Sequence, residues 1–133
     1  GECLGWAHAA MSQNPFNTQP VGVVCLIGVR ASHCRQGIGT ELLRRCEQYL
    51  RERGAESLQA GGHWPNNPFY MGLYGGCDSP GFLKSDPLAE PFFLKHGYRI
   101  EQRILVLQRS LETPMKMFDP RFMALRNRFE LQF

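Results

Sequence analysis

The sequence predicts one α/β (α+β) domain, because a strand, a glycine loop and a helix follow one another near its start. Residues 21–29 are nearly all apolar, as is typical of a strand covered on both faces. Apolar residues recur with helical spacing over about 37–53, and a short strand pattern follows at 57–62. If that helix is a crossover, the two strands are parallel. With 133 residues, the chain is long enough for one core.

The elements up to the first helix are predicted from side-chain periodicity. Residues 3–11 alternate as a strand does, and residues 12–20 are rich in Asn, Pro and Thr, which indicates a loop. Gly28 interrupts the strand 21–29 near its end, where we expect a bulge or a close approach by a ligand. The helix is expected to bury Ile38, Leu42, Cys46, Tyr49 and Leu50, to carry the ion pairs Glu41–Arg45 and Glu47–Arg51, and to end at Gly54.

The second half of the chain is less regular. Residues 63–76 combine aromatics, glycines and prolines, which indicates a structured loop. Asp86 and Pro87 predict the start of a helix over 87–96, and a long strand is expected over 98–111. A short helix from Asp119 and a final strand are expected near the end. We therefore divide the chain into a domain over 1–111 and a C-terminal extension over 112–133.

Composition argues against several classes of protein. The net charge is only +3 with interleaved signs, so no basic stripe indicates a nucleic-acid partner. No segment reaches the roughly 20 apolar residues of a membrane span. Five scattered cysteines without C-x-x-C spacing favour free thiols in a reducing compartment, so we expect a cytoplasmic location. The four histidines lack the spacing of a metal site, and no metal is expected.

The loop between the strand and the helix, residues 34–40, is the most informative segment. It reads Cys-Arg-Gln-Gly-Ile-Gly-Thr. Backbone N–H groups converge at the N-terminus of a helix and the helix dipole favours anions there, while glycines allow a close approach. A G-x-G alone is weak evidence, because many strand-to-helix turns carry glycines for geometry only.

The surrounding spacing resembles that of the GNAT superfamily of acyl-CoA-dependent N-acetyltransferases. Val29 leads to Gly37 at the family's separation, and paired leucines open the helix. Residues 91–98, PFFLKHGY, resemble the family's F-Y-x-x-x-G-F signature. Cys34 stands where the family usually has Gln or Arg, and Phe93 stands at the tyrosine position.

The resemblance covers roughly residues 1–111 and implies a GNAT-like fold. Such a fold has a mixed, mostly antiparallel central sheet with two splayed parallel strands, flanked by helices. Family members usually place a strand, one or two helices and another strand before the region matched here. We therefore expect an N-terminally incomplete domain that lacks one wall of the acceptor site.

The resemblance also implies acetyl-CoA as co-substrate. The amides of residues 36–40 would bind its pyrophosphate, with Thr40 Oγ1 as an extra donor, and main-chain groups near 27–29 would bind its pantetheine like an added strand. A backbone N–H would then polarise the thioester carbonyl. The expected cofactor-binding residues are Ile27, Val29, Arg35, Gln36, Gly37, Ile38, Gly39, Thr40 and Asn67.

The catalytic residues are harder to assign. Counting back from Gly97 puts the family's acid on Phe93, which has no proton to donate; counting forward from Asn67 puts it on Tyr74. Tyr74 is thus the first candidate for the acid and Tyr70 the second. The alternative for both tyrosines is that they only pack within a buried loop. His63 is the candidate base, against the alternative of an ordinary loop histidine.

Three readings of function follow. The first is direct transfer of an acetyl group to a primary amine of a small molecule or a peptide. The second is a non-catalytic acyl-CoA-binding module, favoured by Phe93. The third is a nucleotide-binding domain. It is disfavoured because the sequence has neither a lysine after the glycine loop nor the G-x-G-x-x-G pattern. The acceptor stays open, and the Met/Phe-rich residues 115–129 could cover a second copy, as in a homodimer.

Overall fold

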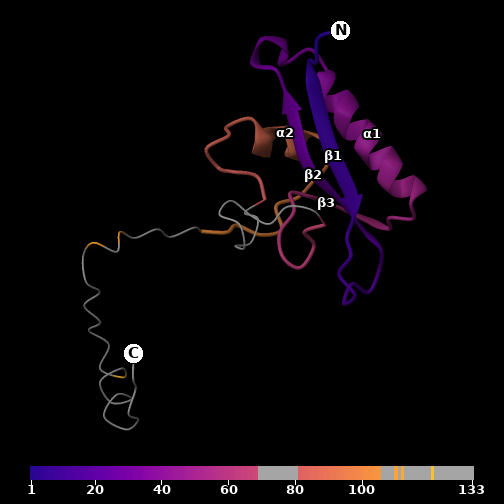
Figure 1. Cartoon of the computed structure of the whole chain (residues 1–133), viewed down its shortest axis with the longest axis vertical. Helices are drawn as coiled ribbons and strands as arrows, with labels where there is room; N and C mark the ends of the chain where they lie inside the picture. The colour runs from indigo at the N-terminus through magenta and orange to yellow at the C-terminus, as the bar shows by residue number, and fades with distance from the viewer. Residues whose placement is uncertain (69–80, 106–109, 111, 113–120, 122–133) are drawn as a thin grey trace.

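The computed structural model describes residues 1–68, 81–105, 110, 112 and 121. Its centre is a three-stranded mixed sheet in the order β1-β2-β3. Two helices, α1 and α2, accompany the sheet, and α1 packs along β1 and β2 (Figure 1). The predicted α/β class with a mixed, helix-flanked sheet is therefore confirmed, with one antiparallel and one parallel strand pair in the described part.

The antiparallel pair joins β1 (Gly5–Met11) to β2 (Val21–Val29). Both strands were predicted, and consecutive buried residues at Val23 and Val24 show that β2 is covered on both faces there. The register shifts once: His8 pairs with Leu26 and Ala9 with Val24, so Cys25 is the extra residue of a bulge.

The expected irregularity at Gly28 therefore lies three residues earlier. Gly28 instead lies against the indole of Trp6. A Cβ at this position would stand 2.8 Å from Trp6 Nε1, so a larger residue would collide with the ring.

The parallel pair joins β2 to β3 (Ser57–Ala60), with α1 as the crossover. Pairing runs only from Val21↔Ser57 to Val24↔Ala60, and one further bond joins Gly61 N to Val24 O at 2.9 Å. Beyond that point β2 continues for five residues, 25–29, with no strand on its β3 side among the described residues. Pairing between the two parallel strands thus stops next to the bulge, where β3 ends.

Helix α1 (Ile38–Glu52) supplies most of the core. Leu43 and Leu50 are 1% and 0% exposed, and they pack with Val24, Cys46 and Phe93. The expected inward stripe is wrong at Tyr49, which is 41% exposed with the Arg53 guanidinium 4.7 Å from its ring centroid. Leu43, rather than Leu42, is the fully buried leucine of the helix's first half.

The expected ion pairs of α1 have different outcomes. Glu41 bonds Arg45 at 2.8 Å, as predicted. Glu47 instead accepts a hydrogen bond from the hydroxyl of Tyr98 at 2.9 Å, and no Glu47–Arg51 ion pair is present among the described residues. Burial and the Glu47 contact raise the pKa of Tyr98, so this hydroxyl remains protonated at neutral pH.

Helix α2 (Ala89–Lys95) begins two residues later than expected. Asp86 still shapes the entry, because its Oδ1 accepts the Leu88 N–H at 2.9 Å. The helix is closed by Gly97, two residues after its end, whose N–H bonds Leu94 O, while Tyr98 N bonds Phe93 O at 3.1 Å. Phe93 lies in the same core cluster as α1, so both helices cover one face of the sheet.

The predicted strand over 98–111 is absent from the described residues 98–105. The backbone of Tyr98 closes the end of α2, and Arg103 pairs with Glu90 of that helix at 3.1 Å. The side-chain interactions of this segment are therefore with α1 and α2 rather than with a neighbouring strand. The expected helix from Asp119, the final strand and most of the 112–133 extension lie outside the described residues, and the division into 1–111 and 112–133 stays a prediction.

Candidate functional site

The loop between β2 and α1 lies at the C-terminal end of β2, next to the N-terminus of the chain (Figure 1). A 3₁₀ turn (Ala31–His33) follows the strand. The backbone then enters the left-handed region at Arg35 (φ 64°) and again at Gly37 (φ 86°), immediately before the helix. Such alternating turns direct successive N–H groups to one side, which is how anion-binding concavities form.

The N–H groups of Gln36, Gly37, Ile38, Gly39 and Thr40, here called the amide row, are the main feature of this loop. None of them bonds to a described backbone or side-chain acceptor, whereas the next N–H, that of Glu41, bonds Gly37 O at 3.0 Å. The N-cap residue Gly37 has no side chain to cap them, and no atom lies within 4 Å of where its Cβ would stand. The amide row is therefore open to an anionic ligand.

Gly39 has a packing role in addition to its place in the amide row. A Cβ on Gly39 would stand 3.3 Å from the ring of Phe92, so the missing side chain lets α2 approach the first turn of α1. The close approach that the sequence assigned to a ligand is thus made by an aromatic ring of the protein itself. The amide of Gly39 remains in the row.

Thr40 and His96 form a contact that the sequence did not reveal. Thr40 Oγ1 lies 3.1 Å from His96 Nε2, and His96 Nδ1 lies 2.8 Å from the carbonyl oxygen of Phe92. A carbonyl can only accept, so Nδ1 carries a proton. When the imidazole is neutral, Nε2 is the acceptor and the Thr40 hydroxyl donates to it. Thr40 Oγ1, expected to donate to the cofactor, therefore donates to His96 in this state.

The edge of β2 that carries Ile27 and Val29 is paired on one side only. These residues pair with Ala7 and Gly5 of β1, while the opposite side faces no strand among the described residues. The side chains of both are half-buried. The main-chain groups of this edge and the amide row therefore follow one another along the chain. A linear ligand could pair with the edge like an added strand and place an anionic end on the amide row.

Two arginines lie in the segment that leads from β2 into the amide row. Arg30 forms an ion pair with Glu2. The side chain of Gln36 turns back to the Ser32 carbonyl at 3.5 Å, whereas Arg35 is exposed.

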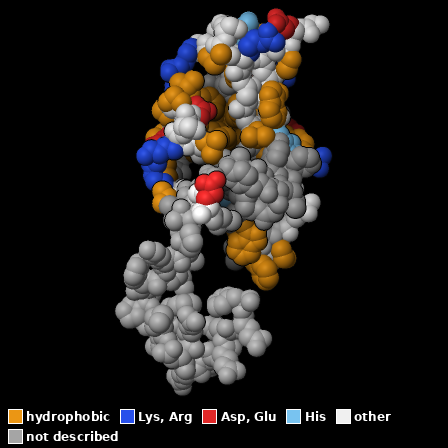
Figure 2. Space-filling view, turned by 60° about the vertical axis from the view of Figure 1, so that its left-hand side comes forward, with side chains coloured by type: hydrophobic (Ala, Val, Ile, Leu, Met, Phe, Trp, Pro, Cys, Tyr) orange, Lys and Arg blue, Asp and Glu red, His pale blue; other side chains and the backbone are white. Residues whose placement is uncertain are grey.

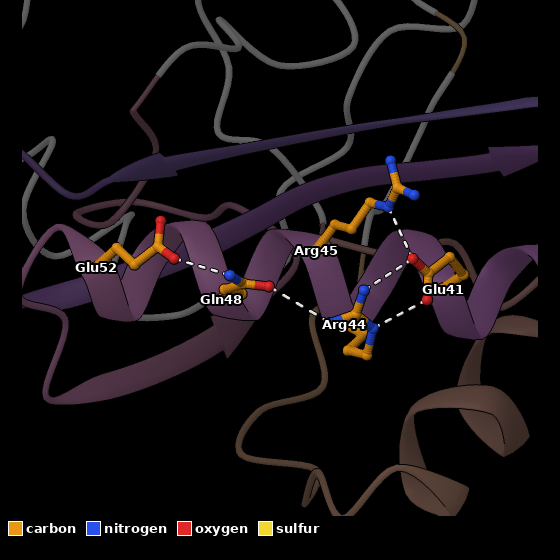
Figure 3. A network of polar contacts seen from close by, with 5 residues as sticks. All are labelled: Glu41, Arg44, Arg45, Gln48 and Glu52. Atoms are coloured by element: carbon orange, nitrogen blue, oxygen red, sulfur yellow. Dashed lines mark hydrogen bonds and ion pairs between the residues drawn. The ribbon is translucent and has the colours of Figure 1, made fainter.

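Two exposed arginines of α1, Arg44 and Arg45, belong to a network along the helix. Glu41 accepts from Arg44 and Arg45, and Gln48 links Arg44 to Glu52 (Figure 3). Hydrogen bonds from Arg44, then from Arg45, lower the pKa of Glu41 to about 2. These contacts hold Arg44 and Arg45 on the exposed side of the helix.

The loop after β3 lies against the β1–β2 loop instead of the amide row. Asn66 Oδ1 accepts from Ser12 Oγ at 2.8 Å and from Asn17 Nδ2 at 3.0 Å, and Asn66 Nδ2 donates to Gln59 Oε1. Figure 1 draws the loop 12–20 at the end of the sheet opposite to the amide row. The polar network thus belongs to the far end of the domain.

Two predicted site residues lie in that loop. His63 Nδ1 is 2.8 Å from the Trp64 carbonyl oxygen, which leaves Nε2 as the basic nitrogen of the neutral ring. Asn67 Oδ1 lies against Gly62. Asn67 also lines a shallow pocket of about 270 Å³ together with Gln13, Asn14, Pro15, Phe16, Trp64 and Pro65. None of the pocket residues belongs to the amide row.

Two exposed aromatics mark this end of the molecule. Phe16 is 87% and Trp64 is 75% exposed. Figure 2 shows hydrophobic side chains projecting from the lower end of the described part, where Figure 1 draws the loop 12–20.

The tyrosines expected to act as acid, Tyr74 and Tyr70, lie outside the described residues. Phe93, at the family's tyrosine position, is 9% exposed and packs edge-on against Tyr98 with ring centroids 5.3 Å apart. Because this position points into the core, a hydroxyl there would be buried. Among the described residues, no group of His, Cys, Asp or Glu could hold a metal ion, and no helix is long and apolar enough to cross a membrane.

The parallel pair, its single crossover helix and the open amide row define an α/β protein of the acetyltransferase fold. The model of the acetyltransferase (GNAT) family matches residues 1–75, more than half of the chain. The chain therefore belongs to the GNAT acetyltransferase family. No curated protein matches it significantly.

Three solved structures with the same fold illustrate the range of proteins to which the chain is similar. An aminoglycoside N-acetyltransferase in complex with CoA has 13% identity and a TM-score of 0.54, over 80% of this chain and 67% of that one. An aminoglycoside acetyltransferase from an uncultured soil metagenomic sample, with trehalose, has 17% identity and a TM-score of 0.53, over 81% and 58%. A transcriptional regulator from Bacillus halodurans C-125 has 15% identity and a TM-score of 0.56, over 80% and 58%.

The likeness to these structures supports the fold, since their sequences are distant. The chain spans between 58% and 67% of their length.

Proposed function

We propose that the protein is an N-acetyltransferase that transfers an acetyl group from acetyl-CoA to a primary amine. The observation that carries this proposal is the amide row beside the one-sided edge of β2. The row offers five N–H donors without internal partners among the described residues, and the edge offers main-chain groups for the two amides of pantetheine. Membership of the GNAT family supports the same donor.

The reaction is direct transfer between two substrates. The lone pair of a neutral amine attacks the thioester carbonyl, the tetrahedral oxyanion forms beside the backbone of β2, and the C–S bond then breaks. The amine loses one proton and the departing thiolate gains one, so the products are an acetamide and free CoA. Tyr74 is our first candidate to protonate the thiolate and Tyr70 the second, while His63 is the candidate for receiving the amine's proton.

The acceptor is proposed only as a class. Two of the structurally similar proteins are described as aminoglycoside acetyltransferases, which act on amine-bearing sugars. A primary amine of a small cationic molecule is therefore the first class to test, and the N-terminus of a peptide is the second. We propose the cytoplasm as the location, on the basis of the cysteine pattern.

Thiol release measures the proposed reaction. The complete chain, incubated with acetyl-CoA and a panel of aminoglycosides, diamines and peptides, is expected to release CoA only with a subset of amines. Tyr74→Phe is expected to lower kcat by roughly 10²-fold or more, as loss of a general acid does, with little change in CoA affinity. Tyr70→Phe is the matched control with the smaller expected effect.

A second candidate is a non-catalytic acyl-CoA-binding module. It is favoured by Phe93, which puts a buried ring where related enzymes have their tyrosine. Wild-type protein that binds CoA but releases no thiol with any acceptor would favour the module. Wild-type protein that binds neither CoA nor acetyl-CoA would rule out both candidates.

A further inference from the structure

The contact between Thr40 and His96 links the amide row to the end of α2. It joins the first turn of α1 to the residue that follows α2, at 3.1 Å between Oγ1 and Nε2. The ring of Phe92 lies 4.6 Å from the imidazole, centroid to centroid, and its carbonyl holds Nδ1. The imidazole is thus held on two sides, and Nε2 is the ring nitrogen that can gain or lose a proton.

The direction of this hydrogen bond matters for an anion on the row. With a neutral imidazole, the Thr40 hydroxyl gives its proton to His96, so its lone pairs face outward and repel phosphate oxygens. If the hydroxyl turned to donate to a phosphate, Oγ1 and an unprotonated Nε2 would be two acceptors in contact. A proton on Nε2 removes that conflict, because Nε2–H then donates to Oγ1 and frees the hydroxyl proton.

We propose that His96 is a positioning residue for the diphosphate of CoA and that diphosphate binding takes up one proton from solvent at His96 Nε2. This inference rests on the proposed function, since it places the diphosphate on the amide row. In the bound state the chain of donors runs from Nε2–H to Thr40 Oγ1 and from the Thr40 hydroxyl to a phosphate oxygen. The negative charge of the diphosphate favours the imidazolium.

The charged groups near this contact are few and mostly paired. On α1, Glu41 follows Thr40 and is bonded to Arg44 and Arg45. On α2, Glu90 is bonded to Arg103, and Lys95 precedes His96. The diphosphate is therefore the main new charge that binding brings to the imidazole.

Calorimetry with 3′-dephospho-CoA tests the proposal. This ligand keeps the diphosphate but lacks the phosphate monoester, which itself titrates near neutral pH. Binding heats measured at pH 7.5 in two buffers of different ionisation enthalpy give the number of protons taken up. Wild-type protein is expected to take up a substantial fraction of one proton, and pantetheine, which has no phosphate, is expected to cause no uptake.

Two variants and one control make the assignment specific. His96→Gln offers Thr40 an uncharged amide, which can accept or donate but cannot be protonated, and Thr40→Val removes the hydroxyl. Each is expected to abolish the uptake and to weaken dephospho-CoA binding roughly two- to tenfold at pH 6.5, with melting temperatures showing that the proteins are folded. The control is His33→Gln, a half-buried histidine of the same loop whose Nδ1 lies 2.9 Å from Ser32 Oγ, which is expected to keep the uptake.

The outcomes separate the two proposals. Dephospho-CoA binding without proton uptake, or uptake that persists in His96→Gln or is lost in His33→Gln, would overturn the inference and leave the proposed function standing. Wild-type protein that binds neither CoA nor dephospho-CoA would overturn the proposed function and this inference together.

Discussion

The two ends of α1 are built in opposite ways. At the C-terminal end, Gly54 (φ 87°) closes the helix, its N–H bonding Arg51 O at 2.9 Å and the Ala55 N–H bonding Leu50 O at 3.0 Å. This is the Schellman arrangement, which satisfies the last carbonyls. At the N-terminal end, Gly37 provides no side-chain cap, and the amide row has no partner among the described residues.

The difference between the two ends of α1 suggests that one end contributes to stability and the other to ligand binding. A side-chain cap at a helix N-terminus typically contributes about 1 kcal/mol, and the protein does without it at Gly37. The helix is held instead by its closed C-terminus and by its buried leucines. We infer that the open end is kept for a ligand, and the comparison predicts that substitutions at one end change stability while those at the other change CoA affinity.

The largest effect on stability is expected from Leu50→Ala, near the closed end. Leu50 is 0% exposed, so truncation should lower the free energy of unfolding by about 2–5 kcal/mol. Denaturant titration measures this loss, and CoA affinity measured without denaturant should stay within twofold of wild type. A tenfold loss of affinity in the folded variant would mean that the two ends are coupled.

Gly37→Ala tests the open end. An alanine held at φ 86° is strained by about 1–2 kcal/mol, and relief of that strain would turn the amide row away from its ligand. We expect CoA affinity to fall about tenfold, equivalent to about 1.4 kcal/mol, as measured by calorimetry. An unchanged dissociation constant would count against the amide row as the diphosphate site.

Gly54→Ala is the matched variant at the closed end. It has the same left-handed backbone and the same open space as Gly37, so the strain is comparable. We expect a loss of about 1 kcal/mol in the free energy of unfolding and no change in CoA affinity. Equal losses of affinity in Gly37→Ala and Gly54→Ala would remove the distinction between the ends.

The smallest effect is expected from Glu41→Gln, between the two ends. Bonds from Arg44 and Arg45 lower the pKa of Glu41 from 4.5 to about 2, so its contribution to stability is present above about pH 4.5 and is lost as the pH falls towards 2. The melting temperatures of wild type and variant should therefore differ slightly at pH 6 and converge near pH 2. Because the pair is exposed, 0.5 M salt should shrink the difference at pH 6. A difference that grew on acidification would have the wrong sign for this pairing.

Local patterns predicted most of the fold. The alternation of residues 3–11, the apolar run 21–29 and the helical spacing after Gly37 each determine their own element, and Gly54 marks the end of α1. The strand expected after Tyr98 was wrong over the described residues, because a strand needs a neighbour and Arg103 pairs with α2 instead. Periodicity does not report which partner a segment finds.

The candidate site was predictable only where it is local. The amide row follows from glycines before a helix, so it could be read from residues 36–40. The Thr40–His96 bond joins two residues far apart along the chain, and only the packing of Phe92 on Gly39 brings them together. His96 stands inside the PFFLKHGY stretch, yet that stretch does not show which way its imidazole points. The placements of Tyr70 and Tyr74 remain predictions.

The bulge at Cys25 decides which side chains of β2 face α1. In a regular strand, residues three apart lie on opposite faces, yet Val24 and Ile27 both pack with the core on the α1 side, because Cys25 is an extra residue between them. Deleting Cys25 would make Leu26 and Val24 direct neighbours opposite His8 and Ala9, so Ile27 and Val29 would keep facing the helix. A one-residue gap at this position should therefore be better tolerated than a gap elsewhere in β2, which would turn the following side chains over.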